Sequence, residues 1–291
     1  MPDLEELEKI NATVRVRVAA FQKINLTKGQ DIMKNENLSV KAATAKLVAL
    51  INQSGNVGKT TIGSHMIAPR LPNLSLVAYI ENTNQIPAPI GVVYGAHEFG
   101  DVEMVLLDAC LKSKSCLIDF GASDFNTTVE MLKQYKAVKD RIDAFIIPCT
   151  PGKKEQIDTE ATIDALIGLG VSPDKIRVLF NKVMHRDKPN LKRLFSNIFT
   201  LRQETMDKHG KTFFASVDAT MFHAEIFKRL YELKMSLEEI LADETDFEKA
   251  IMEESDREKK YDLAHRMSIK GLAENAEKTF DEVFEVLMKG V

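Results

Sequence analysis

One turn constrains this chain more than any other feature. Residues 48–69 read VALINQSGNVGKTTIGSHMIAP, in which an apolar run leads into small and polar residues and GKTT opens a segment with helical spacing. The turn fits the phosphate-binding pattern G-x-x-x-x-G-K-[ST] except at the first glycine, where the chain has Gln53. A buried strand, a glycine-rich turn and a helix N-terminus in this order present backbone N–H groups and a helix dipole to an anion.

Each residue type in the turn has a physical role in such a site. Gly55 and Gly58 allow the backbone to turn around phosphates without a Cβ clash. Lys59 reaches the terminal phosphates, the Thr60 hydroxyl is a candidate Mg²⁺ ligand, and Thr61 extends the anion-binding helix start. A plain strand–turn–helix is the alternative. The strand, both glycines and GKTT all stand in register, which favours the phosphate-binding loop.

Apolar runs alternate with helical patterns through the middle of the chain, as expected for an α/β fold. Continuous apolar runs indicate strands buried on both faces, which parallel sheets require. The runs cover residues 46–51, 74–80, 115–120, 143–149 and 175–181, and helical patterns cover 127–142 and 154–170. We therefore predict a P-loop NTPase fold, a doubly wound and mostly parallel sheet flanked by helices.

Composition and charge divide the chain into three predicted parts. Residues 1–44 form an N-terminal extension, with a helix at 4–24 and a polar linker. Residues 45–200 form the P-loop core, and 201–291 form a helical C-terminal region that packs on the core or extends it. Residues 202–291 hold 14 Lys and Arg against 21 Asp and Glu, whereas the rest of the chain carries a small positive excess.

The segment INQSGNVGKTT resembles the NQKGGVGKTT signature of ParA/MinD-type ATPases, the deviant-Walker-A branch of the P-loop proteins. This branch does not use the first glycine of the common pattern, which accounts for Gln53. The form SGNVGKTT is closer still to StbB-like plasmid-stability proteins. The resemblance implies ATP or ADP with Mg²⁺ as cofactors. It also implies that Asn56 and Val57 join the glycines, Lys59 and the threonines in binding the nucleotide.

Two departures from that signature bear on hydrolysis. The family's signature lysine, which reaches the phosphates of a partner subunit, would fall at Ser54, and a hydroxyl cannot neutralise phosphate charge. At the end of the apolar run 74–80, Glu81 falls where the family has its first aspartate, and Thr83 falls where it has its second. In the family, the second aspartate positions the attacking water, and a threonine lacks that carboxylate. Glu81 is therefore either a candidate catalytic acid beside Lys59 and Asp119 or a solvated acid at a strand end.

Two further polar residues end apolar runs. Asp119 follows SCLI, where a carboxylate beside a phosphate-binding loop holds Mg²⁺ together with Thr60; the alternative is an ordinary strand-end Asp. By the resemblance, Asn181 recognises adenine through its amide; the alternative is an exposed turn residue. Asp124 is a substitute water-positioning acid or, as the spacing favours, the N-cap of the next helix.

The resemblance implies an ATP-binding switch that acts in plasmid stability, DNA partition or conjugative transfer, and the two departures predict slow hydrolysis. A cytoplasmic location is expected. A nucleotide-binding scaffold with little hydrolysis and a metabolic P-loop ligase or kinase are the alternatives. Partners implied by the resemblance are a second copy of the chain and a plasmid-encoded DNA-binding or relaxosome protein. The three cysteines have no metal-ligand spacing and are expected to be reduced.

Two surface features suggest partners of different kinds. Non-specific DNA is a candidate ligand for a basic stretch, for which a solvated loop is the alternative. Its cations are Lys182, Arg186, Lys188, Lys192 and Arg193, with Lys153 and Lys154 nearby. An apolar stripe near the C-terminus, Phe280, Val283, Phe284 and Leu287, lies beside many acids. Membrane binding is therefore disfavoured, and core packing or a protein interface is expected.

Overall fold

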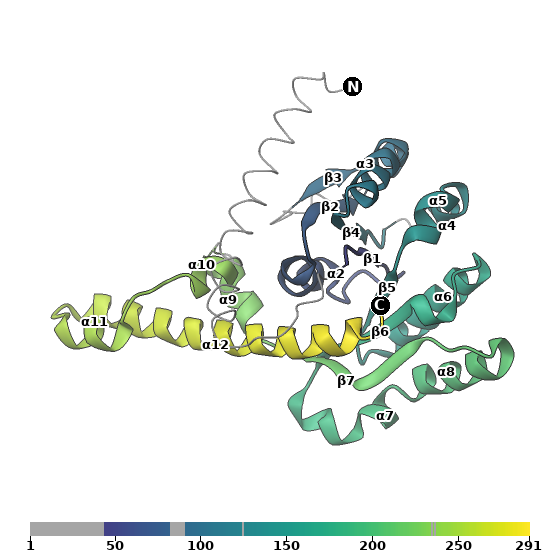
Figure 1. Ribbon diagram of the computed structural model, residues 1–291. Coiled ribbons are helices and arrows are strands. Elements are labelled where there is room, and N and C mark those ends of the chain that lie inside the picture. Colours follow the sequence, from purple (N-terminus) through teal and green to yellow (C-terminus); the bar gives the residue numbers. More distant parts are fainter. Residues whose placement is uncertain (1–43, 82–90, 124, 234, 236) are drawn as a thin grey trace, which may run out of the picture.

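The computed structural model describes residues 44–291 except 82–90, 124, 234 and 236. The predicted N-terminal helix at residues 4–24 lies outside this part. The described residues form one seven-stranded parallel sheet in the order β3-β2-β4-β1-β5-β6-β7 (Figure 1). Its strands are β1 (Leu47–Leu50), β2 (Leu74–Ile80), β3 (Val92–Tyr94), β4 (Ser115–Phe120), β5 (Ala144–Cys149), β6 (Ile176–Val183) and β7 (Phe214–Phe222). The predicted α/β fold class is confirmed.

Helices cover both faces of the sheet, which explains the continuous apolar strands (Figure 1). In β1, Val48 and Leu50 pack into the core on one face, and Leu47 and Ala49, with Ile51 just after the strand, into the core on the other. The first face holds α2 (Lys59–Ile62), the π-helix η1 (Gly63–Ile67), α9 (Ile226–Leu233), α10 (Leu237–Leu241) and α12 (Arg257–Met288). The second holds α3 (Phe99–Leu111), α4 (Phe125–Gln134), α5 (Lys136–Arg141), α6 (Lys153–Gly168), α7 (Leu191–Leu194) and α8 (Ser196–His209).

Five strands coincide with the predicted apolar runs, and two others were not predicted. The edge strand β3 has three half-exposed or exposed residues, VVY, so it lacks an apolar run of useful length. The opposite edge strand, β7, lies in the region predicted to be helical. It pairs with β6 alone and shifts register against it, and the polar residues Ser216 and Asp218 stand in its middle. An edge strand tolerates such residues because one of its sides faces no other strand.

The predicted helix over 127–142 is two helices in the structure. Tyr135 separates α4 from α5, because its backbone (φ −94°, ψ 60°) leaves the helical region. The Tyr135 ring packs edge-on against Phe99 of α3, with 5.1 Å between the ring centroids. A tertiary contact thus accompanies the break, and the hydrophobic spacing of the segment gives no sign of it.

The C-terminal helix α12 packs along the face that carries α2 and η1, where Figure 1 shows it in yellow. Phe280, Val283 and Leu287 are buried in that core, and Phe284 is partly buried beside them. Arg70 holds the helix from outside through ion pairs with Glu277 and Asp281, at 3.2 and 2.7 Å. Of the two predicted roles for the stripe, the structure shows core packing. No helix of the described residues is long and apolar enough to cross a membrane.

Candidate functional site

The phosphate-binding pattern forms a loop at the carboxyl edge of the sheet, between the end of β1 and the start of α2. Ligands of open α/β sheets bind at this edge. Gly58 enters the helix from the left-handed region, with φ 86° and ψ 27°. A Cβ on Gly58 would lie 2.7 Å from Nδ2 of Asn181, so both backbone angle and space require glycine here.

Side-chain hydrogen bonds hold the start of the loop in shape. The buried Asn52 amide donates to Pro148 O and Thr159 Oγ1, at 2.8 and 2.9 Å, and its oxygen accepts from Ser54 N at 2.7 Å. Thr162 of α6 accepts from Gln53 N at 3.1 Å. No local motif in the sequence marks Asn52 or the two threonines, because the residues that they join lie about a hundred positions apart in the chain.

Lys59 lies folded against the loop and is only 5% exposed. Its ammonium donates to the carbonyl oxygens of Asn52 and Ser54, at 3.1 and 2.8 Å. Burial lowers the pKa of Lys59 to about 8, although the nearby charges of Asp119 and Glu81 act to raise it. An anion bound at the loop would therefore compensate a cation that is poorly solvated in the protein alone.

Thr60 and Asp119 meet beside Lys59, as the magnesium hypothesis requires. The Thr60 hydroxyl donates to Oδ2 of Asp119 at 2.8 Å. Oδ1 of Asp119 is buried and has no hydrogen-bond partner, and burial raises the pKa of this carboxyl to about 6. An orphaned carboxylate oxygen next to a hydroxyl is a donor set that suits Mg²⁺, which prefers oxygen ligands. These two residues therefore fit the implied ion.

Glu81 also belongs to this site and is not an isolated surface acid. It stands at the end of β2, accepts a hydrogen bond from the Ser123 hydroxyl, and lies against Gly121, where a Cβ would collide with its carboxylate. The loop, Glu81, Asp119 and Gly121 line one open cleft of about 590 Å³. Thr83 and Asp124 lie outside the described residues.

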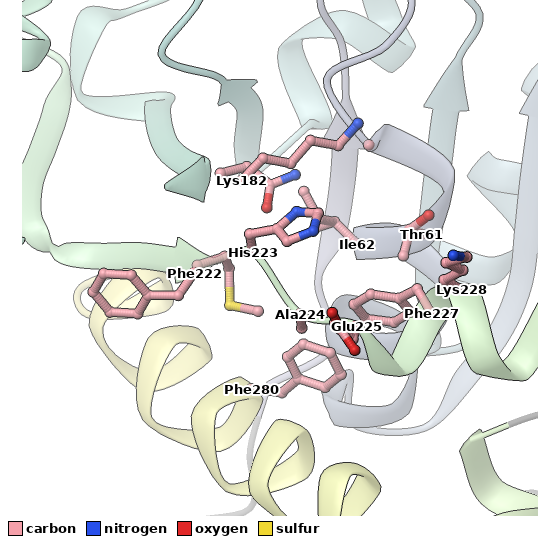
Figure 2. Close-up of a pocket in the computed structure, with 13 residues that line it drawn as sticks. Thr61, Ile62, Lys182, Phe222, His223, Ala224, Glu225, Phe227, Lys228 and Phe280 are labelled. Atoms are coloured by element: carbon pink, nitrogen blue, oxygen red, sulfur yellow. The ribbon is translucent and has the colours of Figure 1, made fainter. Parts of the chain in front are cut away.

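The end of β6 closes the other side of the loop. Asn181 is 9% exposed and donates from Nδ2 to Val57 O at 2.8 Å, and the next residue, Lys182, donates to Asn56 O at 2.7 Å. Asn181 is therefore no exposed turn residue. Beside it lies a second hollow of about 480 Å³ between the ends of β6 and β7, shown in Figure 2. Its lining includes Phe227 of α9 and Phe280 of α12.

The remaining candidates lie apart from the cleft. Lys154 pairs with Asp158 at 2.6 Å, and Lys188 lies over the ring of Phe222. The three cysteines are free, as predicted, although Cys110 is only half-buried. Among the described residues, no group of three or more His, Cys, Asp or Glu side chains could hold a metal ion.

Comparison with known proteins gives similar structures but no sequence relatives. No known family profile and no curated protein matches the sequence. A structure described as a plasmid partition protein of Borrelia burgdorferi B31 bound to AMPPNP is 12% identical; it covers 85% of this chain and 100% of its own, with a TM-score of 0.48. The MinD cell division protein of Aquifex aeolicus is 10% identical and covers 79% of this chain and 96% of its own, with a TM-score of 0.43. A ParA family ATPase of Chlorobium tepidum TLS is 11% identical and covers 84% of this chain and 99% of its own, with a TM-score of 0.39.

Similarity at these identities and TM-scores says nothing about activity. The case for a ligand therefore depends on the geometry of the site itself: a phosphate-binding loop, a desolvated lysine, and a threonine and an aspartate in contact.

Proposed function

We propose that this chain binds Mg²⁺-ATP in the cleft between the loop at residues 52–58 and the ends of β2 and β4. One observation supports this most directly: Lys59, Thr60 and Asp119 converge where α2 begins, and both charged groups are desolvated. Lys59 would contact the terminal phosphates, and Thr60 and Asp119 would hold the ion. The bound Mg²⁺ supplies charge neutralisation on the phosphates.

The hollow shown in Figure 2 suits the nucleoside part of the ligand. It adjoins the loop through Gly58 and Thr61, and the half-buried ring of Phe227 offers apolar surface to a flat ring. Asn181 is positioned at its edge, but its amide already donates to Val57 O. We therefore propose that Asn181 mainly holds the loop in place and that its contact with the base is secondary.

Slow hydrolysis is part of the proposal. Ser54 is buried, and the side chain at this position cannot bring charge to a bound phosphate. A protein that changes partners according to the nucleotide it holds fits this site better than a rapid ATPase. From the resemblance of SGNVGKTT we further propose a role like that of StbB-like proteins, in plasmid partition or conjugative transfer, with a homodimer as the nucleotide-bound form.

Titration calorimetry with Mg²⁺-ATP tests the nucleotide site. Lys59→Ala should reduce affinity by about a hundredfold, because the main cation that faces the terminal phosphates is lost. Lys208→Ala, an exposed lysine on α8, is the matched control and should bind as the wild type does. Equal affinity in Lys59→Ala and the wild type would refute the nucleotide site.

DNA is the second proposed ligand, reached through residues 182–193. Arg186, Lys188 and Lys192 are exposed around η5 (His185–Asn190) and α7, where a phosphate backbone could reach them. Binding to random-sequence duplex should weaken steeply as salt rises, since each phosphate contact releases a counterion. Affinity that does not change with salt would contradict this role.

A further inference from the structure

We propose that Lys182 binds the phosphate chain of the nucleotide from within the same chain and so supplies the charge that Ser54 does not. This inference rests on the proposed nucleotide site and names a further residue in it. Three observations lead to it: the position of the ammonium, the backbone that directs it, and the balance of charge around the cleft.

The ammonium of Lys182 lies on the phosphate-binding loop. It donates to Asn56 O at 2.7 Å, and the side chain passes near Gly58, where a Cβ would lie 3.8 Å from Cε of Lys182. Lys182 lines both the phosphate cleft and the adjoining hollow, and Figure 2 shows its side chain extended along the hollow. An ammonium has three donors, and Asn56 O is the one acceptor that the described residues give it.

The backbone at the end of β6 turns this side chain toward the loop. Lys182 has φ 55°, a left-handed conformation that costs a residue with a Cβ about 1 kcal/mol. The pairing of β6 with β7 shifts register between Phe180 and Val183, which is where Lys182 stands. Irregularities of this kind re-aim side chains next to functional sites. In a regular strand the residue after the inward Asn181 would point to the opposite face of the sheet.

The charges around the cleft also favour a role for Lys182 in phosphate binding. Among the described residues that line the cleft, Lys59 and Lys182 are the cations, and Glu81 and Asp119 are the anions. Without Lys182 the lining would be net negative, which disfavours a polyphosphate. Ser54 is 4% exposed and its N–H and carbonyl are bonded to Asn52 and Lys59, so position 54 contributes no charge.

The test compares ATP, ADP and AMP binding in Lys182→Met, which keeps the length of the side chain and the same backbone strain. If the ammonium binds phosphate, the loss should grow with the number of phosphates: about tenfold for ATP, less for ADP and little for AMP. If all three nucleotides weaken by the same factor, the ammonium does not act on the phosphate chain, and the proposal is overturned.

Three controls separate the outcomes. Lys188→Met removes a nearby lysine that does not line the cleft and should leave the three affinities unchanged. Lys182→Arg keeps the charge and should restore most of the preference for ATP. Lys59→Ala tests the nucleotide site itself: if it lowers ATP affinity while Lys182→Met does not, the role of Lys182 alone is wrong, and if neither does, the nucleotide site is wrong.

Discussion

Gly58→Ala should damage this protein in two separable ways. Gly58 has φ 86°, where an alanine is strained by about 1 kcal/mol. The new Cβ would also lie 2.7 Å from Nδ2 of Asn181, which must then move and give up its hydrogen bond to Val57 O. That bond is worth about 1 kcal/mol. We expect the free energy of unfolding to fall by about 2 kcal/mol in total.

Gly210→Ala is the matched control for the strain that a left-handed backbone imposes on alanine. Gly210 ends α8 with φ 66°, and a Cβ there would meet nothing within 4 Å. It should therefore cost only the strain, about 1 kcal/mol, and leave nucleotide binding intact. Gly58→Ala should in addition weaken Mg²⁺-ATP binding, because the loop loses its brace at the entry to α2.

Urea unfolding of the two glycine variants, of Asn181→Ala and of the Gly58→Ala/Asn181→Ala double variant gives the coupling between the two sites. With the amide removed, the new methyl has room, so the double variant should be more stable than the sum of the single effects by about 1 kcal/mol. Strict additivity, or an equal loss of stability for Gly58→Ala and Gly210→Ala, would refute the role given to Asn181.

Three further predictions use other parts of the structure. Folding raises the pKa of Asp119 from 3.8 to about 6, so the unfolded chain loses this proton at a lower pH than the folded protein does. Without nucleotide, the free energy of unfolding should therefore fall by up to about 3 kcal/mol as the pH rises from about 4 to 6. In urea unfolding at a series of pH values, Asp119→Asn should lack this pH dependence. Truncation after Gly271 removes Phe280, Val283 and Leu287 from the core, about 5–9 kcal/mol of burial, and should leave an unfolded chain by circular dichroism. ATP turnover, measured as released phosphate, should stay below ~1 s⁻¹, and faster turnover would contradict the assignment of Ser54.

The central part of the fold followed from the sequence because its signal is strong and local. Strands such as β4, SCLIDF, are buried along their whole length, so apolar residues dominate each of them. The two edge strands have one strand neighbour each, so part of each strand is exposed to solvent and can hold polar residues such as Asp218. These residues interrupt the apolar pattern by which a strand is predicted. The break at Tyr135 between α4 and α5 depends on a contact with Phe99, which no local pattern reports.

Three residues of the proposed site were predictable because each stands in a local motif or at a strand end. Lys59, Thr60 and Asp119 stand at fixed places relative to strand ends, and the structure brings them together. The residues that shape the loop were not predictable, since the bonds of Asn52 to Pro148 and Thr159 join segments brought together only by the fold. Lys182 was assigned to a basic surface stretch; its backbone angle, invisible in the sequence, places it on the loop.

The C-terminal helix connects the site to the stability of the whole chain. Phe280 of α12 lines the hollow beside the loop, stacks on Phe227 with 5.9 Å between ring centroids, and lies under Arg70, which follows the phosphate-binding helix. About two turns further along α12, near its C-terminal end, Arg177 of β6 donates to Leu287 O at 2.6 Å. The same strand ends in Asn181 and Lys182, which hold the loop. A ligand that orders the loop would therefore also stabilise the packing of α12, because both are fixed by β6.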